Sequence, residues 1–141
     1  MITSVDRVLF LKGVELFSEL PGRELLNLAT IADEVDYVIG NDIFREGDPG
    51  DALFVIVKGQ VEVHRGGRSI AILGARETFG EMAILDSEPR SATVTVLEDV
   101  IALQLEREPF FELLATKRQI ALGIIRMLTR RLRRVISDPA G

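Results

Sequence analysis

Glu81 and Arg90 carry opposite charges nine residues apart, and their types suit the capture of a small polar ligand. The guanidinium of an arginine presents a planar fork of donors that matches two phosphate oxygens in parallel hydrogen bonds. An ionised glutamate only accepts hydrogen bonds, so it needs a donor such as a sugar hydroxyl. An acceptor beside an anion clamp therefore favours a sugar phosphate. The alternative is that Glu81 and Arg90 form an ion pair with each other on the surface.

The segment FGEMAILDSEPRSATV, from Phe79 to Val94, surrounds both residues and interrupts a series of strand patterns. Gly80 has no side chain where the run GEMAIL predicts one or two helical turns, so a ligand could approach the backbone there. Backbone amides at 81–83 would point outward from the start of this helix and favour an anion. Ser91 adds a hydroxyl that can donate to a phosphate or to a base. These features predict an anion-binding turn without specifying the anion.

The elements that position this segment are predicted from hydrophobic periodicity. Residues 1–34 place apolar side chains at helical spacing, with a break at Leu20-Pro21-Gly22. Near the other end, Glu108-Pro109 opens a helix with proline in its first turn, and a longer helix is expected at about 118–136. The sequence therefore predicts helices at both ends of the chain.

Between these helices the hydrophobic period is two, and glycines separate short β-rich runs. The run 53–57 is apolar throughout, as in a buried strand. Gly66-Gly67 lies between two alternating runs and predicts a hairpin with a two-residue turn at positive φ. Two more strands are expected at 92–97 and 101–105, separated by Glu98-Asp99.

These elements predict an α+β fold built on an antiparallel β-roll of the double-stranded β-helix, or jelly-roll-like barrel, kind. We expect one domain over 1–141. Its parts are N-terminal helices at 1–34, a roll at 35–106 that contains the binding segment 79–94, and C-terminal helices at 108–137.

The composition excludes several classes of site. The 141 residues include no cysteine and one histidine, so thiolate chemistry is absent and a zinc site is not expected. No nucleophile–base pair stands out, which argues against an enzyme, and we expect neither a metal nor a cofactor. There is no signal-peptide pattern and no run of about 18 apolar residues. We therefore expect a cytoplasmic chain without a membrane span.

Charge is distributed unevenly along the chain. Residues 1–116 carry 10 basic and 21 acidic side chains, whereas 117–141 carry seven basic and one acidic. A basic helical tail on an acidic body is consistent with nucleic-acid binding. The alternative, which we favour, is that the basic helix lies on the acidic body of the same chain.

The segment 79–94 resembles the phosphate-binding cassette of cyclic-nucleotide-binding domains, as found in bacterial catabolite activators, regulatory subunits of cyclic-AMP-dependent kinases and gated channels. The family pattern is F-G-E-x-A-L followed by P-R-A/S/T-A. Matching residues are Phe79, Gly80, Glu81, Ala83, Pro89, Arg90, Ser91 and Ala92, with Ile84 as a conservative replacement. Upstream glycines from Gly40 to Gly59 resemble the turns of the family's β-roll, and Arg130-Arg131-Leu132 resembles the hinge helix of the bacterial regulators.

The resemblance implies a role for each matching residue. Glu81 would accept a hydrogen bond from the ribose 2′-hydroxyl, and Arg90 would clamp the cyclic phosphate. Backbone amides near Met82 and Ala83, with Ser91, would complete the phosphate site. The apolar wall for the base would come from β-strand residues, namely Ile70, Ala71 and Leu73.

The last helix departs from the catabolite activator. A Thr-Ser pair that contacts adenine there corresponds to Val135 and Ile136 here, which cannot recognise a base by hydrogen bonding. Arg131 falls on an apolar face, so its charge needs a partner. By resemblance that partner is Glu81. Alternatively, the aliphatic stem of Arg131 lies on the apolar surface while its head reaches solvent.

The function expected from these features is a non-enzymatic sensor for a cyclic nucleotide, cAMP or cGMP. Its last helix would move and would form a homodimer through a seam of alternating four- and three-residue spacing: Ala121, Ile125, Leu128, Leu132 and Val135. We expect no DNA binding by this chain. The alternatives are a ligand-free dimerisation module on the same fold, or the sensor half of a larger regulator or transporter.

Overall fold

The computed structural model describes residues 2–137, apart from the side chains of Met82 and Ala83. The chain begins with helix α1 (Ser4–Lys12), a 3₁₀ turn η1 (Glu15–Phe17) and helix α2 (Gly22–Ile31). Thr3 starts α1 with a capping box, in which its hydroxyl accepts from the amide of Asp6 and the Asp6 side chain accepts from the amide of Thr3. The change from helix to strand comes just before the expected boundary, because strand β1 begins at Asp33.

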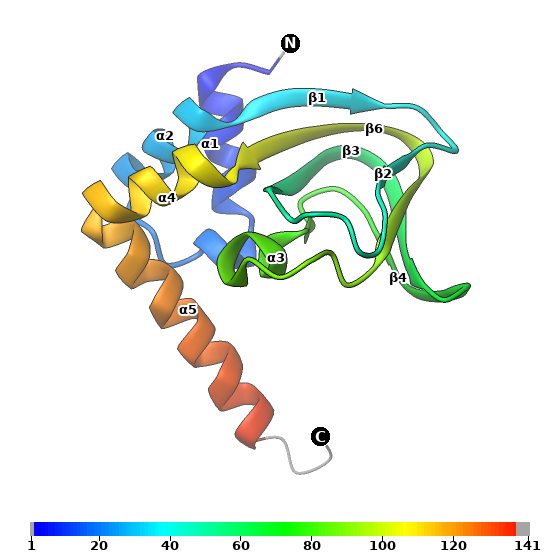
Figure 1. Cartoon of the computed structure of the whole chain (residues 1–141). Helices are drawn as coiled ribbons and strands as arrows, with labels where there is room; N and C mark the ends of the chain where they lie inside the picture. The colour runs from blue at the N-terminus through cyan, green and yellow to red at the C-terminus, as the bar shows by residue number, and fades with distance from the viewer. Residues whose placement is uncertain (1, 138–141) are drawn as a thin grey trace.

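Six strands follow: β1 (Asp33–Tyr37), β2 (Asp42–Phe44), β3 (Ala52–Arg65), β4 (Arg68–Leu73), β5 (Thr78–Phe79) and β6 (Thr93–Glu106). The short helix α3 (Glu81–Asp86) lies between β5 and β6. Helices α4 (Arg107–Thr116) and α5 (Arg118–Ser137) end the described chain. Figure 1 shows the helices gathered at one end of the sheet and α5 extending away from the strands. The predicted α+β class is confirmed.

The strands form one antiparallel sheet in the order β1-β6-β3-β4, with β2 paired to β6 and β5 paired to β3. Among the described residues, β1 and β4 have no pairing with each other, so the roll is not the closed barrel that the sequence suggested as one form. The predicted hairpin is present between β3 and β4. Gly66 and Gly67 have φ of 57° and 79°, as a primed two-residue turn requires.

The expected break at Glu98-Asp99 is wrong, because β6 runs without interruption from Thr93 to Glu106. The irregularity lies instead in β3, where Gly59 has φ of 98° and the β3–β6 register shifts. A Cβ at Gly59 would lie 2.3 Å from the carbonyl oxygen of Asp99, so the two strands approach there more closely than any side chain allows. The Asp99 carboxylate accepts from the amide of Ile39, which gives this polar residue a structural role.

The buried residues form two hydrophobic clusters, one between the helices and the sheet and one inside the roll. One cluster joins the helices to the helical end of the sheet, and it includes Phe17, Leu28, Phe110 and Ile124. The other lies inside the roll around Phe54 and Phe79, whose rings stack with centroids 4.9 Å apart. The predicted buried strand 53–57 supplies residues to both clusters. The second cluster forms the floor beneath the candidate site.

Candidate functional site

Gly80 joins β5 to α3 with φ of 86°, in the left-handed region. A Cβ at this position would lie 2.6 Å from Nη1 of Arg90 and 3.0 Å from the carbonyl oxygen of Ala52. A close approach to Gly80 therefore exists, and the group that makes it is the guanidinium of Arg90. Glycine is required here both for the backbone conformation and for the space that the guanidinium occupies.

The side chain of Arg90 is buried, with 4% of the residue exposed. Nη2 donates to the carbonyl of Ala52 at 2.7 Å and Nη1 donates to the carbonyl of Gly80 at 3.1 Å. The guanidinium carbon lies 4.0 Å from the centre of the Phe44 ring, in a cation–π arrangement. Nε has no hydrogen-bond partner among the described residues. Arg90 thus keeps one buried donor for a further acceptor.

Burial lowers the pKa of the Arg90 guanidinium from its ordinary value, and nearby carboxylates oppose that change. The nearest recorded carboxylate oxygen belongs to Asp51, 3.9 Å from Nη2. The Asp51 side chain is 83% exposed, so its charge is well solvated and compensates the guanidinium weakly. An arginine stays protonated under these conditions. The site therefore holds a buried positive charge that is only partly neutralised.

The backbone of Arg90 is fixed by the loop between β2 and β3. Its amide donates to the carbonyl of Asp48 at 2.8 Å, and its carbonyl accepts from the amide of Gly47 at 2.9 Å. This loop contains the run Gly47-Asp48-Pro49-Gly50 and turns at Glu46 and Gly47. In the structure this turn positions the arginine.

Glu81 is the first residue of α3 and is half-buried. No ion pair joins it to Arg90 within the described part of the chain, so the alternative of a surface pair between the two is not observed. Its charge nevertheless acts on Arg90 from nearby and tends to raise the pKa of the guanidinium. Met82 and Ala83 follow in the same helix, and their side chains lie outside the described residues.

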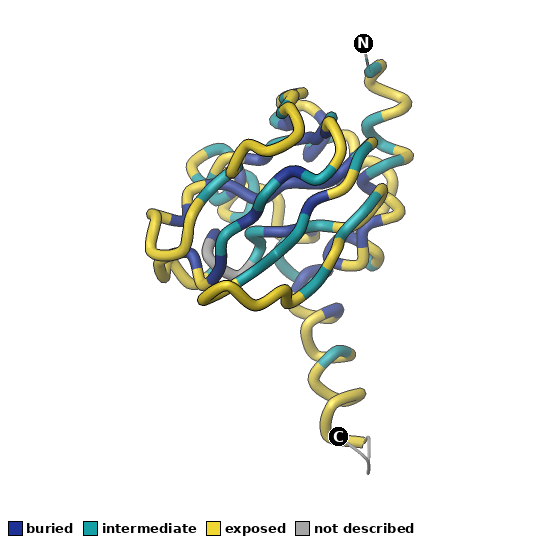
Figure 2. The backbone as a smooth tube through the Cα atoms, turned by 90° about the vertical axis from the view of Figure 1, so that its right-hand side faces the viewer, coloured by how far each residue is buried: buried dark blue, intermediate teal, exposed yellow. Residues whose placement is uncertain are grey.

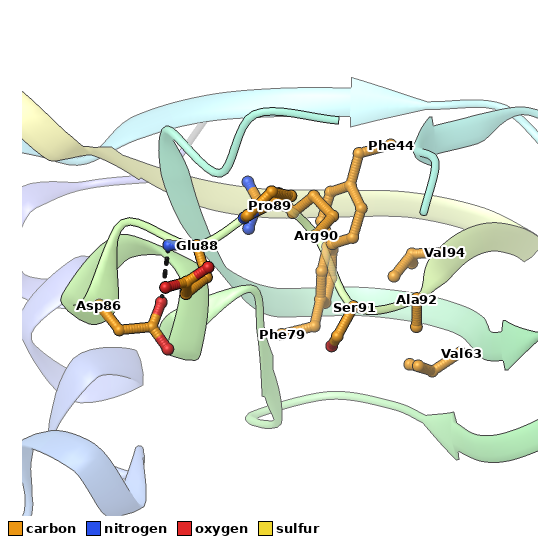
Figure 3. A pocket seen from close by; sticks show the side chains of 10 residues that line it. All are labelled: Phe44, Val63, Phe79, Asp86, Glu88, Pro89, Arg90, Ser91, Ala92 and Val94. Carbon is orange, nitrogen blue, oxygen red and sulfur yellow. Dashed lines mark hydrogen bonds between the residues drawn. The ribbon is translucent and has the colours of Figure 1, made fainter. Parts of the chain in front are cut away.

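A pocket of about 130 Å³, partly open to solvent, lies beside Arg90 (Figure 3). Of the predicted site residues, Phe79, Arg90, Ser91 and Ala92 line it. Four more lining residues lie in the predicted segment 79–94 without having been singled out as ligand contacts, namely Asp86, Glu88, Pro89 and Val94, whereas Phe44 and Val63 lie outside it. Val63 and Val94 are directly paired across β3 and β6, so the alternation of both strands could have assigned them to this face. Phe44 is too far along the chain for any local pattern to indicate its place.

The three residues predicted as a base wall lie on β4, but they do not share one environment. Leu73 pairs with Val61 and Ala71 pairs with Val63, so Ala71 and Leu73 face the inside of the roll with those valines. Ile70 falls at a register shift between two pairs and is 53% exposed. None of the three lines the pocket beside Arg90.

The predicted contact of Arg131 with Glu81 is absent. Arg131 donates from Nη2 and Nε to one carboxylate oxygen of Glu15, at 2.8 and 3.0 Å. Its side chain is 42% exposed and its head is paired with Glu15, so the charge has a partner, as expected, but the partner is neither Glu81 nor solvent. The cause is the direction of α5, which contacts η1 and extends away from the sheet (Figure 1). Val135 and Ile136, near the end of α5, are 66% and 74% exposed.

The basic helix lies on acidic residues of its own chain, as we favoured. Arg131 and Arg134 bond Glu15, and Arg130 bonds Glu19. The hydrogen bond from Arg131 lowers the pKa of Glu15 below its ordinary value, and Arg134 adds to this effect. Each pair is exposed and therefore individually weak. Together they attach α5 to η1.

Comparison with known proteins identifies the family of the fold that contains the segment 79–94. A sequence model described as the cyclic nucleotide-binding domain matches residues 34–117, which include all of the sheet except its first residue, and the pocket beside Arg90. The chain belongs to the cyclic nucleotide-binding domain family. The expected resemblance is thereby confirmed at the level of the family.

The most similar relatives include bacterial regulators. This cyclic nucleotide-binding domain is 32% identical over 141 residues to a CRP-like cAMP-activated global transcriptional regulator of Mycobacterium tuberculosis, covering 96% of this chain and 62% of the relative. It is 37% identical over 128 residues to a cyclic AMP receptor protein of Thermus thermophilus, covering 87% of this chain and 59% of the relative. The chain thus spans about six tenths of the length of these relatives.

A solved structure agrees in fold. The N-terminal domain of a transcriptional regulator from Streptomyces coelicolor A3(2) superposes with a TM-score of 0.83 at 33% identity, covering 89% of this chain and 94% of that one. Within residues 2–137, no cluster of three or more metal-binding side chains occurs, and no helix combines the length and apolar character needed to cross a membrane.

Proposed function

We propose that this cyclic nucleotide-binding domain is a non-enzymatic cytoplasmic sensor that captures a cyclic nucleotide monophosphate, cAMP in the first place and cGMP as the second candidate. The observation that carries the proposal is Arg90, a buried cation beside the pocket with an unpartnered Nε. Burying a charged donor without an acceptor is unfavourable, and a phosphate in the pocket supplies the acceptor.

The phosphate site comprises Arg90, the hydroxyl of Ser91 and the backbone amides near Met82 and Ala83. Two nitrogens of Arg90 already bond carbonyls of Ala52 and Gly80, so these bonds fix the guanidinium before the ligand arrives. A fixed donor loses little side-chain freedom on binding, which favours affinity. Phe79 and Ala92 complete the pocket wall around the phosphate.

Glu81 accepts a hydrogen bond from the ribose 2′-hydroxyl. It stands at the start of α3, one residue after Gly80, and no recorded ion pair occupies its carboxylate among the described residues. An ionised carboxylate can only accept, which suits a sugar hydroxyl and not a phosphate oxygen. The arrangement thus separates the two polar ends of the ligand.

The base lies against aliphatic side chains of β3 and β4, with Ala71 and Leu73 on the inner face and Ile70 at the rim. When α5 closes, Val135 and Ile136 cover the base without donating hydrogen bonds to it. An apolar site discriminates weakly between related ligands, so we propose that cAMP and cGMP differ by at most about 1–3 kcal/mol in binding free energy.

Signalling passes through α5. In this structure the outer part of α5 is exposed over most of its surface (Figure 2), whereas the buried side chains of Ile120, Ile124 and Met127 hold its inner part. A helix held at one end has more than one accessible position, and a ligand selects the position in which it gains contacts. Hydrogen exchange of amides 118–136 in the presence and absence of nucleotide tests this step. We expect slower exchange with ligand, and unchanged exchange at saturation would contradict it.

The exposed seam of α5 forms a homodimer. Ile125, Leu128 and Leu132 are 57%, 37% and 59% exposed, respectively, although all are large aliphatic residues. A row of this length and spacing is typical of a helix that packs on a second helix. Sedimentation of the wild type and of Leu132→Glu tests the interface. A monomeric wild type would contradict it.

A second arrangement makes this chain the sensor part of a larger regulator, because it spans only 62% of the Mycobacterium tuberculosis relative. In either arrangement we propose that residues 1–141 themselves bind no specific DNA, since three arginines of α5 are already paired with Glu15 and Glu19. Any retention of DNA by this chain then falls away at moderate salt, as for non-specific phosphate contacts. Retention of a defined sequence at physiological salt would contradict this part.

Chemical-shift mapping tests the proposed site directly. On addition of cAMP, we expect the largest changes at the amides of 80–83 and 90–92, with smaller changes from 5′-AMP at the same concentration. Nucleotide recovered after incubation is expected to be intact by chromatography. Changes confined to another region, or no changes with any cyclic nucleotide, would overturn the proposal and favour a ligand-free module on the same fold.

A further inference from the structure

Arg65 is the last residue of β3 and lies at the rim of the pocket. Val63, two residues earlier on the strand, lines the pocket, and side chains two apart in a strand share a face. Nε of Arg65 donates to the backbone carbonyl of Ser91 at 2.6 Å. The end of β3 is thereby joined to the segment that carries the phosphate-binding residues.

This bond holds a part of the chain that regular structure does not hold. Residues 87–92 belong to no helix or strand, and β6 begins only at Thr93. Backbone hydrogen bonds to Gly47 and Asp48 fix Arg90, but neither of them involves the amide or the carbonyl of Ser91. The bond from Arg65 fixes the peptide group between Ser91 and Ala92. It therefore constrains the direction of the Ser91 side chain as well.

The charge of Arg65 is not used in an ion pair within residues 2–137. Across the hairpin it is directly paired with Arg68, and like charges in such a pair repel. Five ion pairs are recorded in the described part of the chain, and neither arginine takes part in one. The hydrogen bond to the Ser91 carbonyl therefore explains the direction in which the Arg65 guanidinium points.

We propose that Arg65 is a positioning residue for nucleotide capture. Its bond to the Ser91 carbonyl orients the Ser91 hydroxyl toward the phosphate held by Arg90. The inference rests on the proposed function, and it adds a residue that neither the motif nor the pocket lining indicates.

A double-mutant cycle between Arg65 and Ser91 tests the proposal. We expect Arg65→Met and Ser91→Ala each to weaken cAMP binding about three- to tenfold, the size of one net hydrogen bond. Because both act through the same hydroxyl, the double variant is expected to bind no more weakly than either single variant. Multiplied losses in the double variant, or wild-type affinity in Arg65→Met, would overturn the proposal.

Two further variants separate position from charge. Arg65→Lys keeps the positive charge but lacks the guanidinium Nε, so we expect it to bind as weakly as Arg65→Met. Arg68→Met removes the neighbouring charge from the same hairpin, and its affinity is expected to match the wild type within about twofold. A wild-type affinity in Arg65→Lys would mean that charge alone matters, which would contradict positioning.

A measurement on the ligand-free protein keeps this inference distinct from the proposed function. We expect backbone order at the amides of 91 and 92, measured by ¹⁵N relaxation, to fall in Arg65→Met and to stay unchanged in Arg68→Met. Unaltered order in Arg65→Met would overturn the positioning role whether or not the wild type binds nucleotide. A wild type that binds no nucleotide would instead overturn the proposed function.

Discussion

The guanidinium of Arg90 lies against the backbone of Gly80, so closely that no side chain fits at position 80. The two are also joined by a hydrogen bond from Nη1 to the Gly80 carbonyl at 3.1 Å. Gly80 therefore positions the guanidinium of Arg90, both by the space it leaves and by its carbonyl. The contact also connects the start of α3 to the chain before β6.

Gly80→Ala is expected to reduce both stability and nucleotide affinity. The new Cβ would lie 2.6 Å from Nη1 of Arg90, and the φ of 86° is unfavourable for alanine. We expect a loss of about 1–3 kcal/mol in the free energy of unfolding, with weaker cAMP binding. Denaturant unfolding and calorimetry measure the two effects.

Gly40→Ala is the matched control for that variant. Gly40 has φ of 91°, but its Cβ would meet nothing within 4 Å. It thus carries the backbone strain without the contact, and its nucleotide affinity is expected to equal that of the wild type. Equal effects of the two variants on affinity would show that the contact between Gly80 and Arg90 does not matter for binding.

Arg90→Ala is expected to cost about 2–5 kcal/mol in cAMP binding, as for the loss of one partner of a desolvated charged pair. The variant also leaves the carbonyls of Ala52 and Gly80 without the donors that they have now. Its folding is checked by thermal unfolding without ligand. An unchanged affinity in a folded Arg90→Ala would place the phosphate elsewhere.

Glu81→Gln is expected to weaken binding of cAMP and to leave binding of 2′-deoxy-cAMP nearly unchanged. The amide keeps the size of the side chain but loses the charge that strengthens a hydrogen bond from the ribose. The wild type should therefore prefer the ribose form, and the variant should lose most of that preference. A wild type that binds the 2′-deoxy form equally well would show that Glu81 has no ribose role.

Glu15→Gln is expected to release α5 from η1 and to raise nucleotide affinity slightly. The pairs with Arg131 and Arg134 hold the present position of α5, and closure over a nucleotide requires another. Removing contacts specific to the unliganded position shifts the equilibrium toward the liganded one. Calorimetry measures the change, with Glu112→Gln, an exposed glutamate on α4, as the control. A lower affinity in Glu15→Gln would mean that the pairs favour the bound form.

Stability should depend on pH through the same glutamate. The hydrogen bond from Arg131 lowers the pKa of Glu15 in the folded chain below its ordinary value of 4.5. Its stabilisation is therefore fully present above about that pH and is lost as pH falls through the lowered pKa. Since the Glu15 side chain is 51% exposed, we expect less than about 1 kcal/mol. The free energies of unfolding of the wild type and of Glu15→Gln should differ at neutral pH and become equal in acid.

Local sequence patterns predicted much of this structure. The hairpin at Gly66-Gly67, the buried strand 53–57 and the helix after 118 follow from rules that span only a few residues. The expected break at Glu98-Asp99 failed because these polar side chains suggested a turn, whereas Asp99 is used to bind the amide of Ile39. The irregularity appeared at Gly59 on the partner strand, which no local rule for β6 could indicate.

The candidate site was predicted in part, and the division does not follow polarity. The predicted residues Phe79, Arg90, Ser91 and Ala92 line the pocket, whereas both apolar Phe44 and charged Glu88 were missed. Arg90, Ser91 and Gly80 lie in one segment that the sequence singles out. Phe44, by contrast, reaches Arg90 from β2, and the position of that strand is set by tertiary pairing with β6. Glu15 lies 116 residues from Arg131, so its choice as partner depends on how α5 packs on η1. Contacts of this range require the assembled fold.

The central claim is tested most directly by isothermal titration of the wild-type chain with cAMP. The account predicts saturable binding of one nucleotide per chain with a Kd of about 1 µM or lower, corresponding to about −8 kcal/mol. The absence of heat and of any thermal shift with cAMP, cGMP and cCMP alike would contradict it.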